Sequence, residues 1–305
     1  MLKETHVVVG LGELLWDLFP AGKQLGGAPA NFAYITSLLG DEGIPASRLG
    51  ADDLGAEALQ RLKELGLPTE FVQRDADYPT GTVKVEVDSS GQPRFEIAQS
   101  VAWDFLAWTP QWQTLAQRAD AVCFGSLAQR SEASRATIRN LLGAMRPDAL
   151  RVFDVNLRQD FFTAQALVES MKLSSVVKLN HEELPRIMQI FGLEHSSGEG
   201  SEETSARHLL VTHHLDLVCV TRGTNGSILV SAHETSEHPG FKIKVADTVG
   251  AGDAFTAALA HGYLRNSPLT QINETANRVG AWVASQPGAT PAPNRSLQKT
   301  LDEIG

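Results

Sequence analysis

Short apolar runs alternate along the chain with longer segments in which apolar residues recur every three or four positions. The runs at 121–124, 151–155, 176–179 and 217–220 are bounded by polar residues or glycine, which is typical of buried strands. Helical periodicity predicts helices at 30–39, 53–65, 131–145, 163–172, 182–191, 205–212 and 254–265. This alternation predicts a three-layer α/β fold, in which a mostly parallel sheet carries helices on both faces.

One region follows a different rhythm. Residues 82–88 alternate apolar and polar side chains with a period of two, and residues 94–97 resume that pattern after a turn at 89–91. This predicts an antiparallel hairpin with one apolar face, which indicates a small accessory β-sheet such as a lid. Residues 14–19 are a candidate further strand of it. We expect one domain over 1–305, with lid segments at about 13–24 and 80–102 inserted into it.

Composition narrows the function. A chain of 305 residues suits one large α/β domain, and a formal net charge of −10 argues against nucleic acid as the partner. The N-terminus resembles no signal peptide, and no stretch is long and apolar enough to span a membrane. The two cysteines, Cys123 and Cys219, lie in apolar runs without disulfide or zinc spacing. We therefore expect a cytoplasmic protein that contacts no membrane.

The richest motif lies near the C-terminus, where Gly250, Ala251 and Gly252 open a helix after a β-type run at 241–245. Small residues at a helix start expose backbone N–H groups, which together with the helix dipole bind anions. A carboxylate, Asp253, sits at the same place. A base beside an anion site suits phosphoryl transfer to a hydroxyl, although an ordinary turn with Asp253 as a cap is the alternative.

Two N-terminal features are suited to a polar ligand. Gly27 and its neighbouring glycine precede a helix and permit close backbone approach, and Asn31 offers both a donor and an acceptor to hydroxyls. Asp17 follows an apolar run at 7–9, which is predicted to be the first strand, and is a candidate acceptor for hydroxyl groups. A plain glycine turn, a solvated Asn31 and a surface Asp17 are the alternatives. The glycines at 10 and 12 do not complete the glycine pattern of dinucleotide-binding proteins, because Leu15 occupies the position of its third glycine.

Further polar segments follow predicted strands, and parallel strands bring their carboxyl ends to one ligand-binding edge. Arg158 is a candidate to neutralise phosphate, or else belongs to a plain polar loop. Asn180 and Glu183 are candidates to order hydrated Mg²⁺, or else form a helix cap. The glycines at 223 and 226 would admit a nucleotide, or else form a hairpin turn before 227–231.

These motifs together resemble the ribokinase-like (PfkB) carbohydrate kinase family over nearly the whole chain. The resemblance rests on GGAPANFAYITSLLG at 26–40 and DTVGAGDAFTAALAHGYL at 247–264, with FDVNLR, KLNHEE and VTRGTNG between them in the family's order. The segments GELLWD and SQPGATPAPN look most like bacterial fructokinases. The resemblance implies an ATP-dependent kinase acting on a primary hydroxyl of a monosaccharide, with D-fructose as the expected sugar.

The resemblance also implies residue roles. Asp253 would be the base, and Gly250, Ala251 and Gly252 would form the anion hole, with Arg158 near the phosphates or the sugar. Asp17, Gly27 and Asn31 would hold sugar hydroxyls under a lid carrying Phe95. Thr221, Gly223, Gly226, Gly252 and Asn277 would line the ATP site. Asn180 and Glu183 would help hold Mg²⁺ through water, and Asp247 with residues 285–289 would supply a K⁺ site.

Three further expectations stay open. Relatives dimerise through the lid, so a homodimer is compatible with this chain. A 2-keto-3-deoxygluconate kinase is the alternative substrate class, and Lys84 and Arg94 are the candidate partners for the carboxylate of such a sugar acid. A sugar-binding sensor without catalysis is the alternative from another class.

Overall fold

The computed structural model describes residues 5–20, 22–87, 93–194, 198, 200–294 and 297. Within them, the main sheet contains β1 (Val7–Leu11), β4 (Glu42–Gly50), β5 (Val72–Asp75), β8 (Ala121–Phe124), β9 (Leu150–Asp154), β10 (Val176–Asn180), β11 (Leu217–Thr221), β12 (Ser227–Ser231) and β13 (Thr235–His238). Their order is β13-β12-β11-β10-β9-β8-β1-β4-β5. All neighbours from β11 to β5 are parallel, whereas β12 is antiparallel to both of its neighbours.

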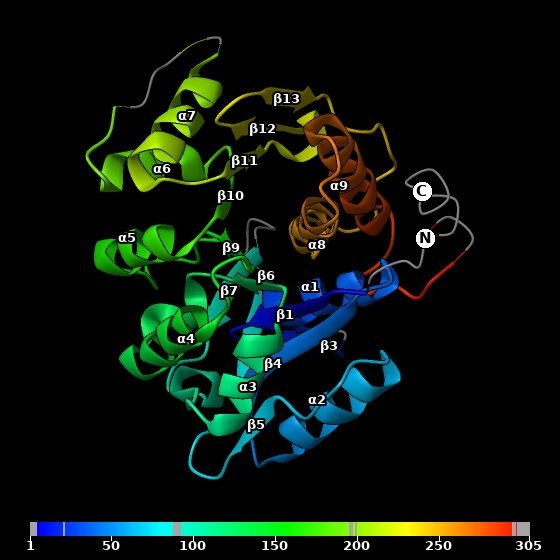
Figure 1. The fold of residues 1–305 in the computed structure, drawn as a ribbon. Helices are drawn as coiled ribbons and strands as arrows, with labels where there is room; N and C mark the ends of the chain where they lie inside the picture. Colours follow the sequence, from blue (N-terminus) through cyan, green and yellow to red (C-terminus); the bar gives the residue numbers. More distant parts are fainter. Residues whose placement is uncertain are drawn as a thin grey trace.

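Helices cover both faces of this sheet, as predicted (Figure 1). They are α1 (Ala28–Leu38), α2 (Asp53–Glu64), α3 (Pro110–Arg118), α4 (Glu132–Ala144), α5 (Ala164–Leu173), α6 (Glu183–Ile190), α7 (Ser201–His213), α8 (Ala251–Leu264) and α9 (Leu269–Ala284), with short 3-10 turns at η1 (Ala102–Phe105), η2 (Leu127–Arg130) and η3 (Gly223–Asn225). Helices α3 to α7 enclose one core, and α1, α2, α8 and α9 enclose the other.

The buried strands contribute side chains to both hydrophobic cores, one on each face of the sheet. Within β9, Phe153 packs into the core under α3 to α7, whereas Val152 packs into the core under α1 and α8. The same alternation holds for Val9 and Val8 of β1. Because successive side chains of a strand point to opposite faces, a sheet covered on both sides needs continuous apolar runs. This is the physical origin of the short runs in the sequence.

The predicted accessory sheet is present beside the main one. It contains β2 (Leu15–Phe19), β3 (Gly22–Gly26), β6 (Gly81–Val87) and β7 (Pro93–Ile97) in the order β3-β2-β6-β7. Strands β6 and β7 form the expected antiparallel hairpin, whose turn at 89–91 lies outside the described residues. Val83 and Ile97 are buried, whereas Phe95, two residues before Ile97, is 54% exposed. The apolar face of this lid sheet therefore continues past the body of the protein.

One predicted strand is wrong. Residues 241–245 form no strand, and the strand that precedes α8 in sequence is β13. Ile243 and Val245 are 37% and 44% exposed, so the alternation at 241–245 has no buried side to support it. The pattern also missed β3, β4, β5, β13, α3 and α9. No helix in the described part of the chain is both long and apolar enough to cross a membrane.

Candidate active site

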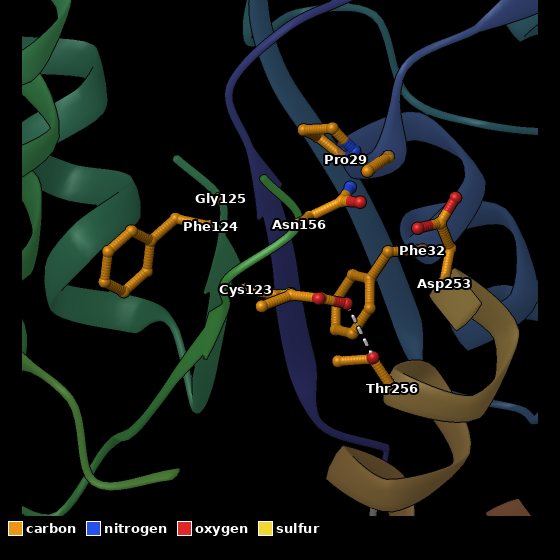
Figure 2. A pocket seen from close by; sticks show the side chains of 10 residues that line it. Pro29, Phe32, Cys123, Phe124, Gly125, Asn156, Asp253 and Thr256 are labelled. Carbon is orange, nitrogen blue, oxygen red and sulfur yellow. Dashed lines mark hydrogen bonds between the residues drawn. The ribbon is translucent and has the colours of Figure 1, made fainter. Parts of the chain in front are cut away.

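A pocket opens at the carboxyl ends of β8 and β9, between α1 and α8 (Figure 2). It is lined by Ala28, Pro29, Phe32, Cys123, Phe124, Gly125, Asp154, Asn156, Asp253 and Thr256. The Phe124 ring itself points away into the core on the other side of the sheet. Carboxyl ends of parallel strands are where α/β folds bind ligands. The glycine-rich starts of α1 and α8 and the polar segment after β9 thus meet at one edge.

The start of α8 has unused hydrogen-bond donors. Gly250 caps the helix with φ 77°, and a Cβ at this position would lie 2.5 Å from the Cβ of Ala289, so only glycine fits. Among the described residues, the backbone N–H groups of Gly252 and Asp253 have no acceptor. Unsatisfied N–H groups at a helix start attract anions. The glycine-rich turn therefore has the geometry of an anion site.

Asp253 lies beside this anion site and accepts a hydrogen bond from a residue of α1. Asn31 Nδ2 donates to Asp253 Oδ2 at 2.8 Å, although the two residues are 222 positions apart. Burial and the nearby charge of Asp154 raise the pKa of Asp253 to about 6, against the Asn31 bond and the charges of Lys178 and Arg158. A general base is most effective when its pKa lies near the working pH. Asn31 Oδ1 is buried and accepts no hydrogen bond from any described residue.

Two more carboxyl groups belong to this region. Burial raises the pKa of Asp17, on β2, to about 6, and the Arg158 guanidinium opposes that rise. Glu13 is 4% exposed, and burial raises its pKa to about 7 despite nearby backbone N–H groups and Arg158. Sequence analysis overlooked Glu13, although a carboxylate interrupting an apolar run was a usable signal. Arg158 is exposed, and its charge acts on Asp17, Glu13 and Asp253, so it lies on the same side as the predicted sugar contacts.

Gly27 and Phe95, both predicted to border the sugar, lie at the N-terminus of α1 and on the lid strand β7. Gly27 caps α1 with φ 109°, and a Cβ there would lie 2.4 Å from the Glu13 carbonyl oxygen. The close approach of these two backbones therefore requires glycine. On the lid, the Phe95 carbonyl oxygen accepts a 2.7 Å hydrogen bond from Gln159 Nε2. This bond connects β7 to the loop that carries Arg158.

A buried ion pair that sequence analysis did not identify lies beneath the anion site. Lys178 Nζ, on β10, is 3.1 Å and 3.2 Å from the two carboxylate oxygens of Asp154, at the end of β9. Thr256 Oγ1 donates to Asp154 Oδ2 at 2.9 Å (dashed in Figure 2). A lysine within an apolar strand was the available signal, but its partner is 24 residues away.

Asn180 and Glu183 form a helix cap, which was the predicted alternative to a role in ordering Mg²⁺. Asn180 Oδ1 accepts from the N–H groups of Glu182 and Glu183, and Glu183 Oε2 accepts from Asn180 N at 2.8 Å. Glu183 Oε1 accepts from Leu157 N at 2.7 Å, which fixes the loop after β9. Because all three oxygens already accept backbone donors, they suit contact with Mg²⁺ through water rather than direct ligation. Within the described residues, no group of three His, Cys, Asp or Glu side chains could hold a metal.

The residues predicted for the nucleotide lie around β11 and α9. Thr221 ends β11, and the turn through Gly223 joins it to the antiparallel β12, as the hairpin alternative predicts. A Cβ on Gly226 would lie 1.9 Å from the His238 carbonyl oxygen, so packing alone requires this glycine. Asn277 Nδ2 is buried and donates to Ser227 Oγ at 2.7 Å. That bond gives Asn277 a structural role, and its contact with adenine stays a prediction.

The segments predicted for K⁺ are adjacent. Asp247 Oδ2 accepts from Gly288 N at 3.1 Å, and Asp247 N donates to the Ala284 carbonyl at 3.3 Å. The other carboxylate oxygen of Asp247 accepts from Val249 N. Both oxygens thus already hold this loop, and backbone carbonyls would have to supply further ligands. A K⁺ site here stays a prediction.

Comparison with known proteins agrees with this architecture. A model of pfkB family carbohydrate kinases matches residues 17–295. The fructokinase of Klebsiella pneumoniae is 30% identical over 311 residues, which cover 95% of this chain and 98% of that protein. These matches extend over the main sheet, the lid strands and the α8 motif together.

Solved structures give the same picture. An uncharacterized sugar kinase from Pyrococcus horikoshii, in complex with ATP, superposes with a TM-score of 0.81 and 28% identity, covering 98% of this chain and 100% of that chain. A double mutant of Vibrio cholerae fructokinase, bound to fructose, ADP and a potassium ion, has a TM-score of 0.80 and 25% identity over 97% of this chain and 98% of its own.

Proposed function

The chain belongs to the PfkB family of carbohydrate kinases, and on that premise we propose that it transfers the γ-phosphoryl group of ATP to a primary hydroxyl of D-fructose. The observation that carries the proposal is the start of α8. There, a carboxylate with a pKa raised to about 6 stands beside backbone N–H groups that no described residue satisfies. Asp253 accepts the proton of the hydroxyl, and the turn at Gly250, Ala251 and Gly252 stabilises the charge of the moving phosphoryl group.

The remaining roles are those that the family resemblance implies. The sugar hydroxyls donate hydrogen bonds to Asp17 and Asn31, and Gly27 allows the sugar to come close to the backbone. The lid sheet with Phe95 excludes water. Thr221, Gly223, Gly226 and Asn277 border the nucleotide. Asn180 and Glu183 would hold Mg²⁺ through water, and the ion would supply positive charge to neutralise the phosphates. Asn31 both orients Asp253 and offers a free buried acceptor, so a hydroxyl donor completes its hydrogen bonding.

A neutral sugar suits this pocket better than a sugar acid. Asp17 and Glu13 both have raised pKa values, and a substrate carboxylate beside them would add like charge. Lys84 is exposed on the lid, and the side chain of Arg94 lies outside the described residues. Arg158 is the one observation that favours the 2-keto-3-deoxygluconate alternative, because its guanidinium acts on the same carboxylates.

The test is ADP release from ATP with Mg²⁺ and K⁺ present, using fructose, ribose, 2-keto-3-deoxygluconate, tagatose phosphate and adenosine. We expect kcat/KM to be highest for fructose. Preference for 2-keto-3-deoxygluconate would replace the substrate and assign Arg158 to its carboxylate. Tight fructose binding by calorimetry without ADP release would instead support a sugar sensor.

Three further expectations belong to the proposal. Omitting K⁺ should lower turnover if Asp247 and residues 285–289 bind it. The exposed Phe95 makes the lid face the surface for a homodimer, which sedimentation of the Phe95→Asp variant would test. A reducing cytoplasm suits Cys123 and Cys219, which are buried and unpaired.

A further inference from the structure

The Lys178 ammonium lies directly behind the backbone of the proposed anion hole. A Cβ at Gly252 would lie 3.2 Å from Lys178 Nζ, so the ammonium borders the Gly252 main chain. Both carboxylate oxygens of Asp154 accept from the same ammonium, at 3.1 Å and 3.2 Å. In the described part of the chain, Lys178 Nζ has no hydrogen-bond acceptor other than Asp154. An ammonium carries three donors, and among the described residues only the two oxygens of Asp154 accept from them.

Stability alone does not explain this pair. The Lys178 and Asp154 side chains are 8% and 6% exposed, and desolvating two charges offsets most of their attraction. A well-packed apolar pair at such a position is often as stable. A buried cation at this place does have a use, because fixed charges act strongly on a reacting group in a water-excluded site.

We infer that Lys178 is an electrostatic residue of the anion hole, whose ammonium, held by Asp154 behind Gly252, balances the charge of the transferring phosphoryl group. This inference rests on the proposed function, because it takes the turn at Gly250 to Gly252 as the phosphoryl site. Asp154 is then a positioning residue. Its carboxylate fixes the ammonium and keeps the site's resting charge balanced.

Thr256, on α8, connects Asp154 to the backbone at Gly252. Its Oγ1 is 2.9 Å from Asp154 Oδ2 and 3.0 Å from the Gly252 carbonyl oxygen. A single hydroxyl therefore links the carboxylate that holds Lys178 to the backbone of the anion hole. Thr256 therefore ties α8 to the end of β9, and it acts as a second positioning residue.

The deciding experiment is the double variant Asp154→Asn/Lys178→Met, which removes both charges and nearly preserves shape. Neither partner is then left as a lone buried charge, so the fold should survive. We expect the KM for the sugar to stay unchanged and kcat to fall by about 10²-fold, the usual effect of losing one donor of an oxyanion hole. A kcat within threefold of wild type would show that the pair is only structural and would overturn the inference.

Two further variants keep the test decisive. Thr256→Val removes the linking hydroxyl with little change of shape, and we expect kcat to fall several-fold with an unchanged sugar KM. If the double variant does not fold, wild-type kcat in Thr256→Val overturns the inference. Asp41→Asn is the matched control, since it removes a buried carboxylate at the far end of α8 and should leave kcat unchanged.

The inference and the proposed function can fail separately. All variants are compared with wild type on whichever sugar of the panel turns over, so a different substrate leaves the test intact. Normal turnover in Asp253→Asn would overturn the proposed chemistry, whatever Lys178 does. Loss of kcat in Asp253→Asn but not in the Lys178 double variant would overturn only the inference.

Discussion

Each end of α8 has a carboxylate beside it, Asp41 at the C-terminal end and Asp253 at the N-terminal end, and their surroundings differ in how completely the hydrogen bonds are satisfied. At the C-terminal end, Asp41 accepts from His261 Nδ1 at 2.7 Å and from Arg265 Nη2 at 2.7 Å, and His6 N donates to it as well. Both of its oxygens have partners, and the cations suit the negative end of the helix dipole. At the N-terminal end, backbone donors at Gly252 and Asp253 remain unpaired among the described residues.

This contrast distinguishes polar groups that stabilise the fold from polar groups that bind a ligand. Buried polar groups in folded proteins are nearly always satisfied, and both oxygens of Asp41 have donors within the fold, so this carboxylate needs no ligand. Unused donors beside a carboxylate indicate that something outside the chain completes them. One helix thus anchors the sheet at one end and presents chemistry at the other.

The largest expected effect is at the N-terminal end. Asp253→Asn should lower kcat by about 10²–10⁴-fold, because a general base contributes that much to proton transfer. The amide is nearly isosteric, so thermal unfolding and fructose affinity should stay close to wild type. Steady-state kinetics with calorimetry on the same preparation checks both. Turnover near the wild-type value would remove Asp253 from the mechanism.

The opposite end should respond in stability instead. Asp41→Asn leaves Arg265 and His261 without their carboxylate, and we expect a loss of about 2–3 kcal/mol in the free energy of unfolding, below the full value for a buried pair because both cations are partly exposed. Urea unfolding measures this loss. A fall in kcat without a loss of stability would contradict the division between the two ends.

The sign of the pH dependence follows from Asp41 itself. Burial alone would raise its pKa, but hydrogen bonds from His261 and Arg265 hold the pKa of Asp41 well below its usual range. A carboxyl with a depressed pKa stabilises the fold above its unfolded pKa, near 3.9, and loses this as pH falls toward the folded value. The difference between wild type and Asp41→Asn should therefore be full at pH 7 and shrink below about pH 4.

Local patterns in the sequence predicted what depends on local rules. Buried parallel strands need continuous apolar runs, so β8 to β11 could be found, and the glycines before Asp253 marked the start of a helix. Strand β4 was missed because Pro45 argues against a central strand. In the fold, Pro45 lies opposite Gly10 of β1, and that long-range pairing is invisible in the local pattern.

The site shows the same limit. Asp253 and Asn31 are recognisable one at a time, yet their hydrogen bond joins helices 222 residues apart. Lys178 looks like an irregularity within a strand until Asp154 is placed beside it. Asn180 and Glu183 were identified as a pair because capping acts over three residues. Partners that meet only through the sheet need the topology first.

An intermediate effect is expected from pH. Because the pKa of Asp253 is raised to about 6, kcat/KM should be level above that pH and fall about tenfold per unit below it, as the base becomes protonated. Glu13, with a pKa raised to about 7, and the charges of Asp154, Lys178 and Arg158 act on the same site. Glu13→Gln therefore serves as the control for the assignment. If kcat/KM of the Asp253→Asn variant still falls at low pH, the group that titrates is not Asp253.

The smallest effect tests the link between α1 and α8. Asn31→Ala removes the donor to Asp253 and the free acceptor Oδ1, so we expect the sugar KM to rise about tenfold, the value of one good hydrogen bond. The same bond lowers the pKa of Asp253, and its loss should move the acid limb of kcat/KM to higher pH. Ser37→Ala, on the same helix, removes only a hydroxyl bonded to Ala33 and should match wild type. A higher KM with an unmoved limb would mean that Asn31 contacts the sugar without tuning the base, whereas an unchanged KM would remove it from the sugar site.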